Sequence, residues 1–237
     1  MTHWDVNSGE ELSSLKLRGG PIYNGAISSL GNVFAVEGPA HVIQLRDFQD
    51  GQVLHEMTGH SSFVMSFTFS ADGSLLATAD DNGLIKVWEV KSGSLVHSLT
   101  GHPSPVGSLA CSTDKTLLAS GGVEGSYEIK IWDLTNGEEI ISLGKHTGNV
   151  YDMAFSPDRA LLASSSGDLT VKLWDVVTGE VLNTAASLML NHGIPVLIVS
   201  KRLGHSKPSI TLDVYGHLIP SQQEEAANLM DNLMSGG

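Results

Sequence analysis

Residues 145–175, KHTGNVYDMAFSPDRALLASSSGDLTVKLWD, are the clearest indication of the fold, because they contain short runs of alternating apolar and polar residues that are separated by turn residues. The pattern predicts one strand over 149–155, a turn over 156–159, a second strand over 160–164 and a third strand over 171–176. The chain then turns into a fourth strand. Because successive side chains of a strand point to opposite faces, each strand has two faces to bury within a sheet.

Tryptophans mark a repeat of this unit along the chain. Trp88, Trp132 and Trp174 lie 44 and 42 residues apart, and an acidic residue follows each of them. Stepping back 42 residues from Trp88 reaches Arg46, and stepping back 42 more reaches Trp4. The pairs Gly59-His60 and Gly101-His102 and the variant Lys145-His146 recur at the same intervals. Two independent markers that share one period predict a repeat array.

With these markers, residues 1–182 resemble a WD-repeat propeller, whose blades of four antiparallel strands carry Gly-His near the start and Trp-Asp at the end. The units run roughly over 7–50, 51–92, 93–136 and 137–182. The resemblance implies a mainly β fold, an incomplete propeller of about four blades. Four units are fewer than the roughly seven that are typical of the family, which leaves sheet faces and edges open. The arc either closes unusually tightly, pairs with another chain, or is a fragment of a longer ancestral propeller.

The resemblance also implies a buried polar network in each blade, in which a linked chain of donors and acceptors satisfies an indole and an imidazole together. The last unit has the full set, which is His146, Ser164, Asp168 and Trp174. The unit that ends at Trp88 has His60, Thr78 and Asn82, so that an amide replaces the carboxylate. The unit that ends at Trp132 has His102 and Ser120, with Ser126 at the aspartate position beside a two-residue insertion. The first unit has Arg18 and Arg46 at the histidine and tryptophan positions.

The alternative roles for these histidines are metal binding and acid–base catalysis. One ligand in each repeat, about 42 residues from the next, does not assemble a local site, so we interpret the histidines as part of the scaffold. We therefore expect no metal and no cofactor. The resemblance implies that exposed loops bind a protein partner, which the sequence does not identify.

The strand pattern ends after Val181, and residues 183–237 have the composition of helices. Candidate helices cover 185–191, 196–203, 209–215 and 222–234, and the last of them is amphipathic. The sequence thus predicts a small all-α C-terminal segment.

This tail contains Leu203-Gly204-His205 and then Asp213-Val214-Tyr215-Gly216-His217, and it resembles the C-terminal end of phage-type tyrosine recombinases (integrases). The resemblance implies that Tyr215 is the nucleophile that forms a phosphotyrosyl bond with DNA and that His205 is a catalytic histidine. It also implies that the helix over 222–234 docks on a neighbouring protomer. The cations of the tail are candidate DNA contacts, or else a solvated face: Lys201, Arg202 and Lys207.

The catalytic arginines of such recombinases are missing from this chain. The His-x-x-Arg box of the family corresponds to Gly179 and Leu182, which already belong to the repeat sequence. Losing one such charge stabiliser costs about 2 to 4 kcal/mol in the transition state, so losing nearly the whole set predicts loss of turnover. A zinc site made by the histidines of the tail is the less favoured alternative, because no cysteine lies near them.

We therefore interpret the chain as a chimera in which the WD-repeat-like part is joined to the recombinase-like tail near residues 182–184. The first hypothesis is a protein-interaction scaffold of WD repeats with a truncated, inactive recombinase tail. The alternative is DNA integration or site-specific recombination through Tyr215, in trans with a complete recombinase. A third reading is a decayed gene product or an assembly artefact. The open blades and the helix over 222–234 are candidate oligomerisation elements, and we expect marginal stability.

Composition agrees with a strand-rich protein that is inside the cell. Of the 237 residues, 41% are hydrophobic, 16% are charged and 26 are glycines. The net charge is −13, of which −12 falls in residues 1–183, so the objection to binding phosphates applies to the repeats and only weakly to the tail. The single cysteine, Cys111, excludes an internal disulfide framework. The longest apolar run, 194–199, is too short to cross a bilayer and the N-terminus is no secretory signal, so we expect a cytoplasmic protein without membrane contact.

Overall fold

The structure is a computed structural model that describes residues 2–4, 8–14 and 24–184, and these residues are mainly β. They form four antiparallel sheets of four strands each, and each sheet uses four strands that are consecutive in the chain. A two-stranded sheet precedes them. The mainly β fold with about four blades is thereby confirmed. The predicted helices after residue 184 lie outside the described residues.

The strands have the following bounds. The two-stranded sheet joins β1 (Thr2–Trp4) and β2 (Glu11–Ser14). The first four-stranded sheet contains β3 (Gly25–Ile27), β4 (Val33–Glu37), β5 (Ile43–Asp47) and β6 (Val53–Met57), with the 3-10 turn η1 (Pro39–His41) between β4 and β5. The second contains β7 (Val64–Phe69), β8 (Leu75–Asp80), β9 (Ile85–Glu89) and β10 (Leu95–Leu99). The third contains β11 (Val106–Cys111), β12 (Leu117–Gly122), β13 (Glu128–Asp133) and β14 (Glu138–Lys145). The fourth contains β15 (Val150–Phe155), β16 (Leu161–Ser166), β17 (Val171–Asp175) and β18 (Val181–Thr184).

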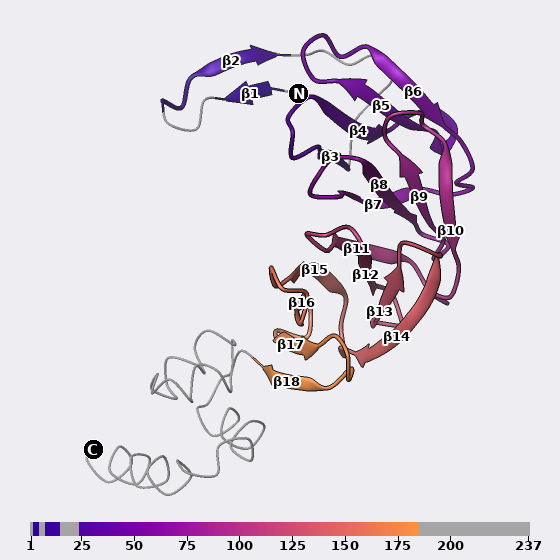
Figure 1. Cartoon of the computed structure of the whole chain (residues 1–237), viewed down its shortest axis with the longest axis vertical. Helices are drawn as coiled ribbons and strands as arrows, with labels where there is room; N and C mark the ends of the chain where they lie inside the picture. The colour runs from indigo at the N-terminus through magenta and orange to yellow at the C-terminus, as the bar shows by residue number, and fades with distance from the viewer. Residues whose placement is uncertain (1, 5–7, 15–23, 185–237) are drawn as a thin grey trace, which may run out of the picture.

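The four sheets lie side by side in an open arc, with the first sheet at one end and the fourth at the other (Figure 1). The first strands of the sheets contact one another in the order β3, β7, β11 and β15, and the last strands lie toward the outer rim. Each sheet inside the arc therefore has two covered faces. We call the face toward the following sheet the forward face and the face toward the preceding sheet the rear face.

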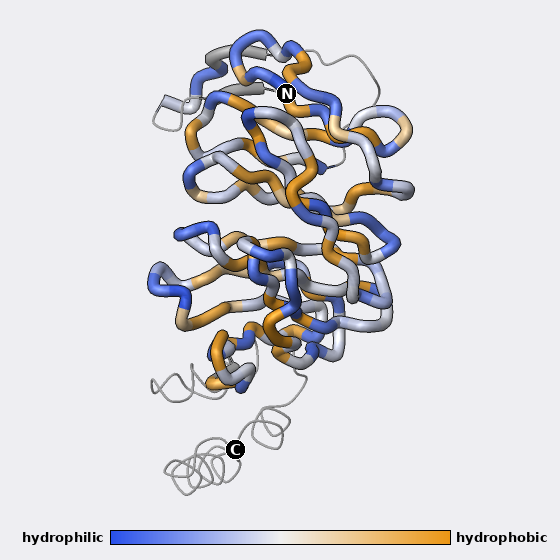
Figure 2. Tube along the Cα trace, turned by 45° about the vertical axis from the view of Figure 1, so that its right-hand side comes forward, coloured by the Kyte–Doolittle hydropathy of each residue, from blue (hydrophilic) through white to orange (hydrophobic). Residues whose placement is uncertain are grey.

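The core consists of three apolar layers, one between each pair of neighbouring sheets. In each layer the third strand of one sheet contributes two β-branched or leucine side chains, which pack against a leucine and a tryptophan of the next sheet. The layers contain Ile43 and Leu45 with Leu76 and Trp88, Ile85 and Val87 with Leu118 and Trp132, and Ile129 and Ile131 with Leu162 and Trp174. Figure 2 shows these hydrophobic stretches within the body of the arc. Burying each such aliphatic side chain contributes about 1.5 to 3 kcal/mol.

The sheets are offset from the repeats of the sequence. β10 follows Trp88 and so belongs to the next sequence unit, yet it completes the second sheet, where Leu99 pairs with Ile85. β14 completes the third sheet and β18 the fourth in the same way. Each sequence unit therefore supplies the outermost strand of one sheet and the three inner strands of the next.

Two further findings apply to the part of the chain that the structure describes. It contains no helix that is long and apolar enough to cross a membrane. It also contains no cluster of three histidine, cysteine or acidic side chains that could hold a metal ion.

Candidate functional site

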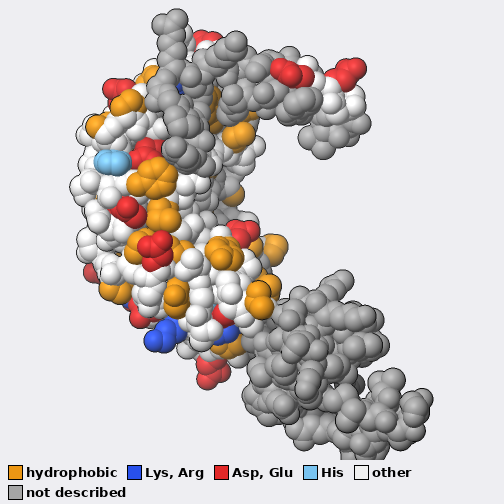
Figure 3. Space-filling view, turned by 180° about the vertical axis from the view of Figure 1, so that it is seen from behind, with side chains coloured by type: hydrophobic (Ala, Val, Ile, Leu, Met, Phe, Trp, Pro, Cys, Tyr) orange, Lys and Arg blue, Asp and Glu red, His pale blue; other side chains and the backbone are white. Residues whose placement is uncertain are grey.

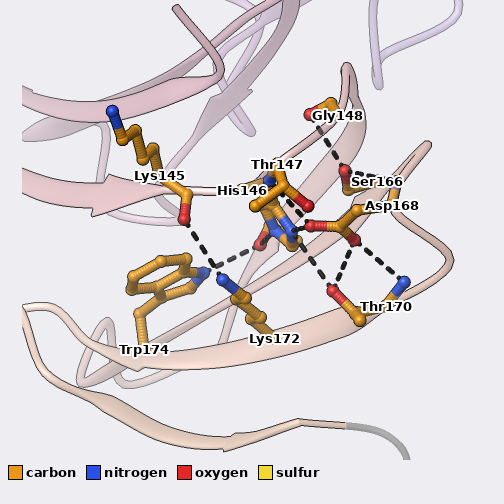
Figure 4. A network of polar contacts seen from close by, with 10 residues as sticks. Lys145, His146, Thr147, Gly148, Ser166, Asp168, Thr170, Lys172 and Trp174 are labelled. Atoms are coloured by element: carbon orange, nitrogen blue, oxygen red, sulfur yellow. Dashed lines mark hydrogen bonds and ion pairs between the residues drawn. The ribbon is translucent and has the colours of Figure 1, made fainter. Parts of the chain in front are cut away.

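The fourth sheet holds a chain of polar contacts that starts at a buried indole (Figure 4). The Nε1–H of Trp174 donates to Oγ of Ser164 at 2.8 Å, and Ser164 Oγ lies 2.7 Å from Nε2 of His146. The other ring nitrogen of His146, Nδ1, lies 2.8 Å from Oδ2 of Asp168. The side chain of His146 is fully buried and that of Asp168 is 8% exposed.

The direction of the protons in this chain follows from the indole, which can only donate. Ser164 accepts from Trp174 and gives its own proton to Nε2 of His146, so Nδ1–H of a neutral ring donates to Asp168. Burial lowers the pKa of His146 below its usual value, although Asp168 opposes this shift, and the ring is therefore neutral at pH 7.

Asp168 is the acceptor at the end of the chain and also holds the turn before β17. It accepts from the backbone N–H of Thr147 at 3.0 Å, from the backbone N–H of Thr170 at 3.0 Å and from Oγ1 of Thr170 at 2.6 Å. Burial raises the pKa of Asp168, but the hydrogen bonds from Thr170, Thr147 and His146 outweigh it and hold the pKa well below its usual range. A charged carboxylate thus ties the turn to the histidine.

The second sheet makes the same chain with a carboxylate from another position, which corrects the sequence interpretation. Trp88 donates to Thr78 at 2.9 Å, Thr78 lies 2.7 Å from Nε2 of His60, and Nδ1 of His60 lies 2.8 Å from Oδ2 of Asp80. The side chains of His60 and Asp80 are both fully buried. The expected residue, Asn82, instead contacts Ser61 at 3.4 Å.

The physical reason for this correction lies in the turn that follows β8. Oδ1 of Asp80 accepts the backbone N–H groups of Asn82 and Leu84 at 3.1 and 3.0 Å, which folds the turn around the carboxylate and leaves Oδ2 for His60. The carboxylate therefore acts from two residues earlier than in the fourth sheet. Burial lowers the pKa of His60, against the opposing effect of Asp80.

In the third sheet the series of hydrogen bonds from the tryptophan ends at the histidine, without an acceptor beyond it. Trp132 donates to Ser120 at 2.7 Å and Ser120 lies 2.7 Å from Nε2 of His102, but Nδ1 of His102 has no hydrogen-bond partner. Oγ of Ser126, at the aspartate position expected from the sequence, is also buried without a partner. Burial, with a smaller effect of Lys130, lowers the pKa of His102 to about 4.

The first sheet replaces the tryptophan by an arginine, as the sequence indicated. Nη1 of Arg46 donates to the carbonyl of Gly51 and Nη2 to Oε1 of Gln44, both at 2.7 Å, while Nε has no partner. The guanidinium therefore binds its own hairpin. The matching Arg18 lies outside the described residues.

A lysine lies two residues before Trp88, Trp132 and Trp174, a feature that the sequence interpretation missed. Lys86 Nζ lies 5.9 Å from the ring centroid of Trp88, and Lys172 Nζ lies 5.4 Å from that of Trp174. Lys130, at the same position in the third sheet, instead pairs with Glu139 at 2.8 Å. The spacing Lys-x-Trp in three repeats was the available signal, since both side chains lie on one face of a strand.

Outside the networks, a hollow with polar walls lies beside the turn that follows β12. It has a volume of about 370 Å³ and is lined by Pro103, Ser104, Glu124, Gly125, Ser126, Glu128 and Lys145. It is open to solvent and carries charges of both signs, which suits contact with a partner surface better than enclosure of a small molecule.

The predicted catalytic and DNA-contact residues lie beyond residue 184, outside the described residues. These are Tyr215, His205, Lys201, Arg202 and Lys207. The structure accordingly brings together only the network residues, in three separate sheets.

Comparison with known proteins identifies two kinds of similarity. A family model described as "WD domain, G-beta repeat" matches residues 51–89, 93–133 and 137–175, which together are about half of the chain. The ICEBs1 integrase of Bacillus subtilis (strain 168) is 40% identical over 48 residues, 20% of this chain and 13% of the integrase. A tyrosine recombinase XerC-like protein of Caldanaerobacter subterraneus subsp. tengcongensis is 38% identical over 53 residues, 22% of this chain and 14% of that protein. The chain thus spans about one seventh of the length of these two relatives.

Proposed function

Because the chain belongs to the WD-repeat family, we propose that it is a protein-interaction scaffold whose recombinase-like tail is catalytically inactive. The observation that carries the proposal is the use of His60, His102 and His146, all of them buried in the sheets and bonded to a serine or threonine. Side chains used in this way stabilise the blades and leave recognition to the exposed loops.

We propose residues 1–182 as the scaffold and residues 183–237 as the appended tail, in which we place the integrase similarity because the Leu203-Gly204-His205 and Tyr215-Gly216-His217 motifs lie there. Inactivity of the tail follows from the missing arginines, since a phenol nucleophile needs cations on the phosphate that it attacks.

We place the partner contact at the polar hollow lined by Glu124 and Lys145. Glu124 is exposed and lies at a positive φ of 52°, on the turn between β12 and β13. The turn holds this conformation in part because the backbone N–H of Glu124 donates to Oδ1 of Asn149 at 3.0 Å, from the loop before β15. A loop that is fixed by its neighbour presents a defined surface at little entropic cost.

Affinity capture from a lysate with the purified full chain tests this contact. We expect a protein that binds the wild type to be lost with Glu124→Lys and retained with Glu138→Lys. The control changes another exposed glutamate, which lies at the start of β14 and so at the opposite end of the strands of the third sheet. Capture that is the same for all three chains, or the same as that of resin alone, would count against the proposal.

A second candidate function, DNA integration or recombination through Tyr215, is favoured by the similarity to the two recombinases. It predicts a covalent adduct between the chain and a nicked DNA substrate, formed alone or with a complete recombinase, that Tyr215→Phe abolishes. If wild type and Tyr215→Phe give the same result in denaturing gels, this second function is excluded.

A further inference from the structure

Among the residues that the structure describes, no sheet covers the forward face of the fourth sheet, although the equivalent face is buried in the other three sheets. Ile43, Ile85 and Ile129 lie in the third strands of their sheets, three residues before Arg46, Trp88 and Trp132, and are each 0% exposed. Val171 occupies this position in β17 and is 43% exposed. Leu173 follows the same pattern: it is half-buried where its equivalents are fully buried. The fourth sheet, which lies at one end of the arc (Figure 1), thus exposes apolar side chains of the kind that neighbouring sheets cover elsewhere. Seen from behind, hydrophobic side chains also reach the surface at several places on the described part of the arc (Figure 3).

This face nevertheless differs from the covered ones by one charge. Asp152 of β15 pairs with Ser165 in the register in which Ser108 of β11 pairs with Gly121. Ser108 is 4% exposed inside the arc, whereas Asp152 is exposed and lines a shallow hollow of about 130 Å³ together with Ala154, Ala163 and Val171. A further sheet packed here would bury an unpaired carboxylate, which costs several kcal/mol. The face therefore suits an apolar occupant that brings a cation.

A second copy of the chain fits this requirement poorly. Two fourth sheets packed face to face would each present Asp152 to the other, and like charges repel. The rear face of the first sheet in another copy is also not available to pack there. Phe34, which lies on that face at the position equivalent to Leu76, is only 1% exposed.

The segment that follows β18 fits in charge, composition and reach. β18 pairs with β17, so the described chain ends at Thr184 beside the strand that carries Val171 and Leu173. Residues 194–199 are the longest apolar run of the sequence, and Lys201 and Arg202 follow after one serine. The nine residues between 184 and 194 can span about 30 Å when extended, which exceeds the width of about 15 Å of a four-stranded sheet.

We propose that residues 194–202 pack in cis on the forward face of the fourth sheet, with the apolar run over Val171 and Leu173 and with Lys201 or Arg202 paired to Asp152. The short connection gives a high effective concentration, so that modest contacts are sufficient.

Thiol labelling in the full chain tests the coverage. Val171→Cys reports on the face, and Val177→Cys, at a position that is 84% exposed on the turn before β18, is the matched control. Cys111 gives little background, because burial raises the pKa of its thiol to about 11. We expect Val171→Cys to react at least about tenfold more slowly than the control, as for a site that reacts only on local opening. Adding Lys201→Glu and Arg202→Glu should restore its reactivity without changing the control.

Labelling of Val171→Cys within about twofold of the control, as the exposures of a bare face predict, would overturn the proposal. Protection that increases with protein concentration would overturn it as well, since it would identify a second copy as the occupant. If Val171→Cys does not fold, the proposal is tested by zero-length carbodiimide cross-linking of the wild-type chain. The expected product is a link between Asp152 and Lys201 within one monomer, absent in Asp152→Asn; no such link in the wild type refutes the proposal.

Discussion

Replacing Asp168 by asparagine tests whether the buried polar chain stabilises its sheet through the charged end. The amide keeps the shape of the side chain and can still accept from Thr170. Its Nδ2 group, however, faces Nδ1–H of His146 and the backbone N–H of Thr147, both of which donate to Oδ2 of the aspartate at 2.8 and 3.0 Å. In the variant, the Nδ2 group of the asparagine, itself a donor, therefore faces two other donors and no hydrogen bond forms at this point.

The expected loss follows from these two bonds. Hydrogen bonds to a charged group contribute about 1.5 to 3 kcal/mol each, and water cannot replace them readily because Asp168 is 8% exposed. Allowing for local rearrangement, we expect Asp168→Asn to lower the free energy of unfolding by about 3 kcal/mol at pH 7, or the melting temperature by about 6 to 12 °C.

The direction in which stability changes with pH provides an independent test. The pKa of Asp168 is lowered in the folded state, so its stabilisation is present above the unfolded pKa of about 3.9 and is lost as the pH falls below it. The variant should lose less stability than the wild type on acidification through this range, measured by urea unfolding with tryptophan fluorescence.

Ser126→Ala is the control, because the Oγ of Ser126 is buried without a hydrogen-bond partner and its loss should therefore not lower stability. If Asp168→Asn cost no more than this control, or if it kept the acid sensitivity of the wild type, the assignment of a stabilising charge to the network would be wrong.

Three further changes test other parts of the scaffold. Burial lowers the pKa of His102 to about 4, so folding disfavours the charged ring and stability should fall as the pH drops from about 6.5 to about 4; His102→Gln should reduce this slope in urea titrations, and an unchanged slope would refute the cause. Gly83→Ala should cost at least about 2 kcal/mol more than Gly31→Ala in thermal unfolding, because both glycines have positive φ but only a Cβ at Gly83 would meet the carbonyl of His102, at 2.6 Å; equal costs would contradict this. Asp80→Asn should cost about 3 kcal/mol by leaving His60 without its charged acceptor, while Asn82→Asp stays within about 0.5 kcal/mol of the wild type; the reverse order in chemical denaturation would restore the sequence interpretation.

The fold could be predicted from the sequence because its signals are local and repeated. Alternation over 149–155 and 171–176 places apolar side chains on two faces, and β15 and β17 lie there. The period set by Trp88, Trp132 and Trp174, extended back to Arg46, also gives the number of four-stranded sheets, since each of these residues lies near the end of a third strand.

The geometry of the networks could not be predicted to the same depth. Alignment by spacing placed Asn82 opposite His60, but a carboxylate can reach the same ring nitrogen from Asp80 when the turn wraps around it. Spacing alone likewise does not tell whether Ser126 reaches His102, because the insertion lets Glu124 and Tyr127 adopt positive φ angles that redirect the turn. Such outcomes depend on backbone conformation over a few residues, to which a pattern of residue types is insensitive.

The offset between sequence units and sheets has an evolutionary consequence. Because every unit completes the preceding sheet with its first strand, an in-frame deletion of residues 93–136 would remove β10 to β13 and let β14 take the place of β10 beside β9. The three remaining blade sheets would still have four strands each. Unequal exchange between repeats can therefore lengthen or shorten the arc by whole sheets, and a foreign segment can be spliced after β18 without leaving a sheet one strand short. The architecture tolerates gene rearrangement at such boundaries, and the change of sequence character in this chain falls at one of them.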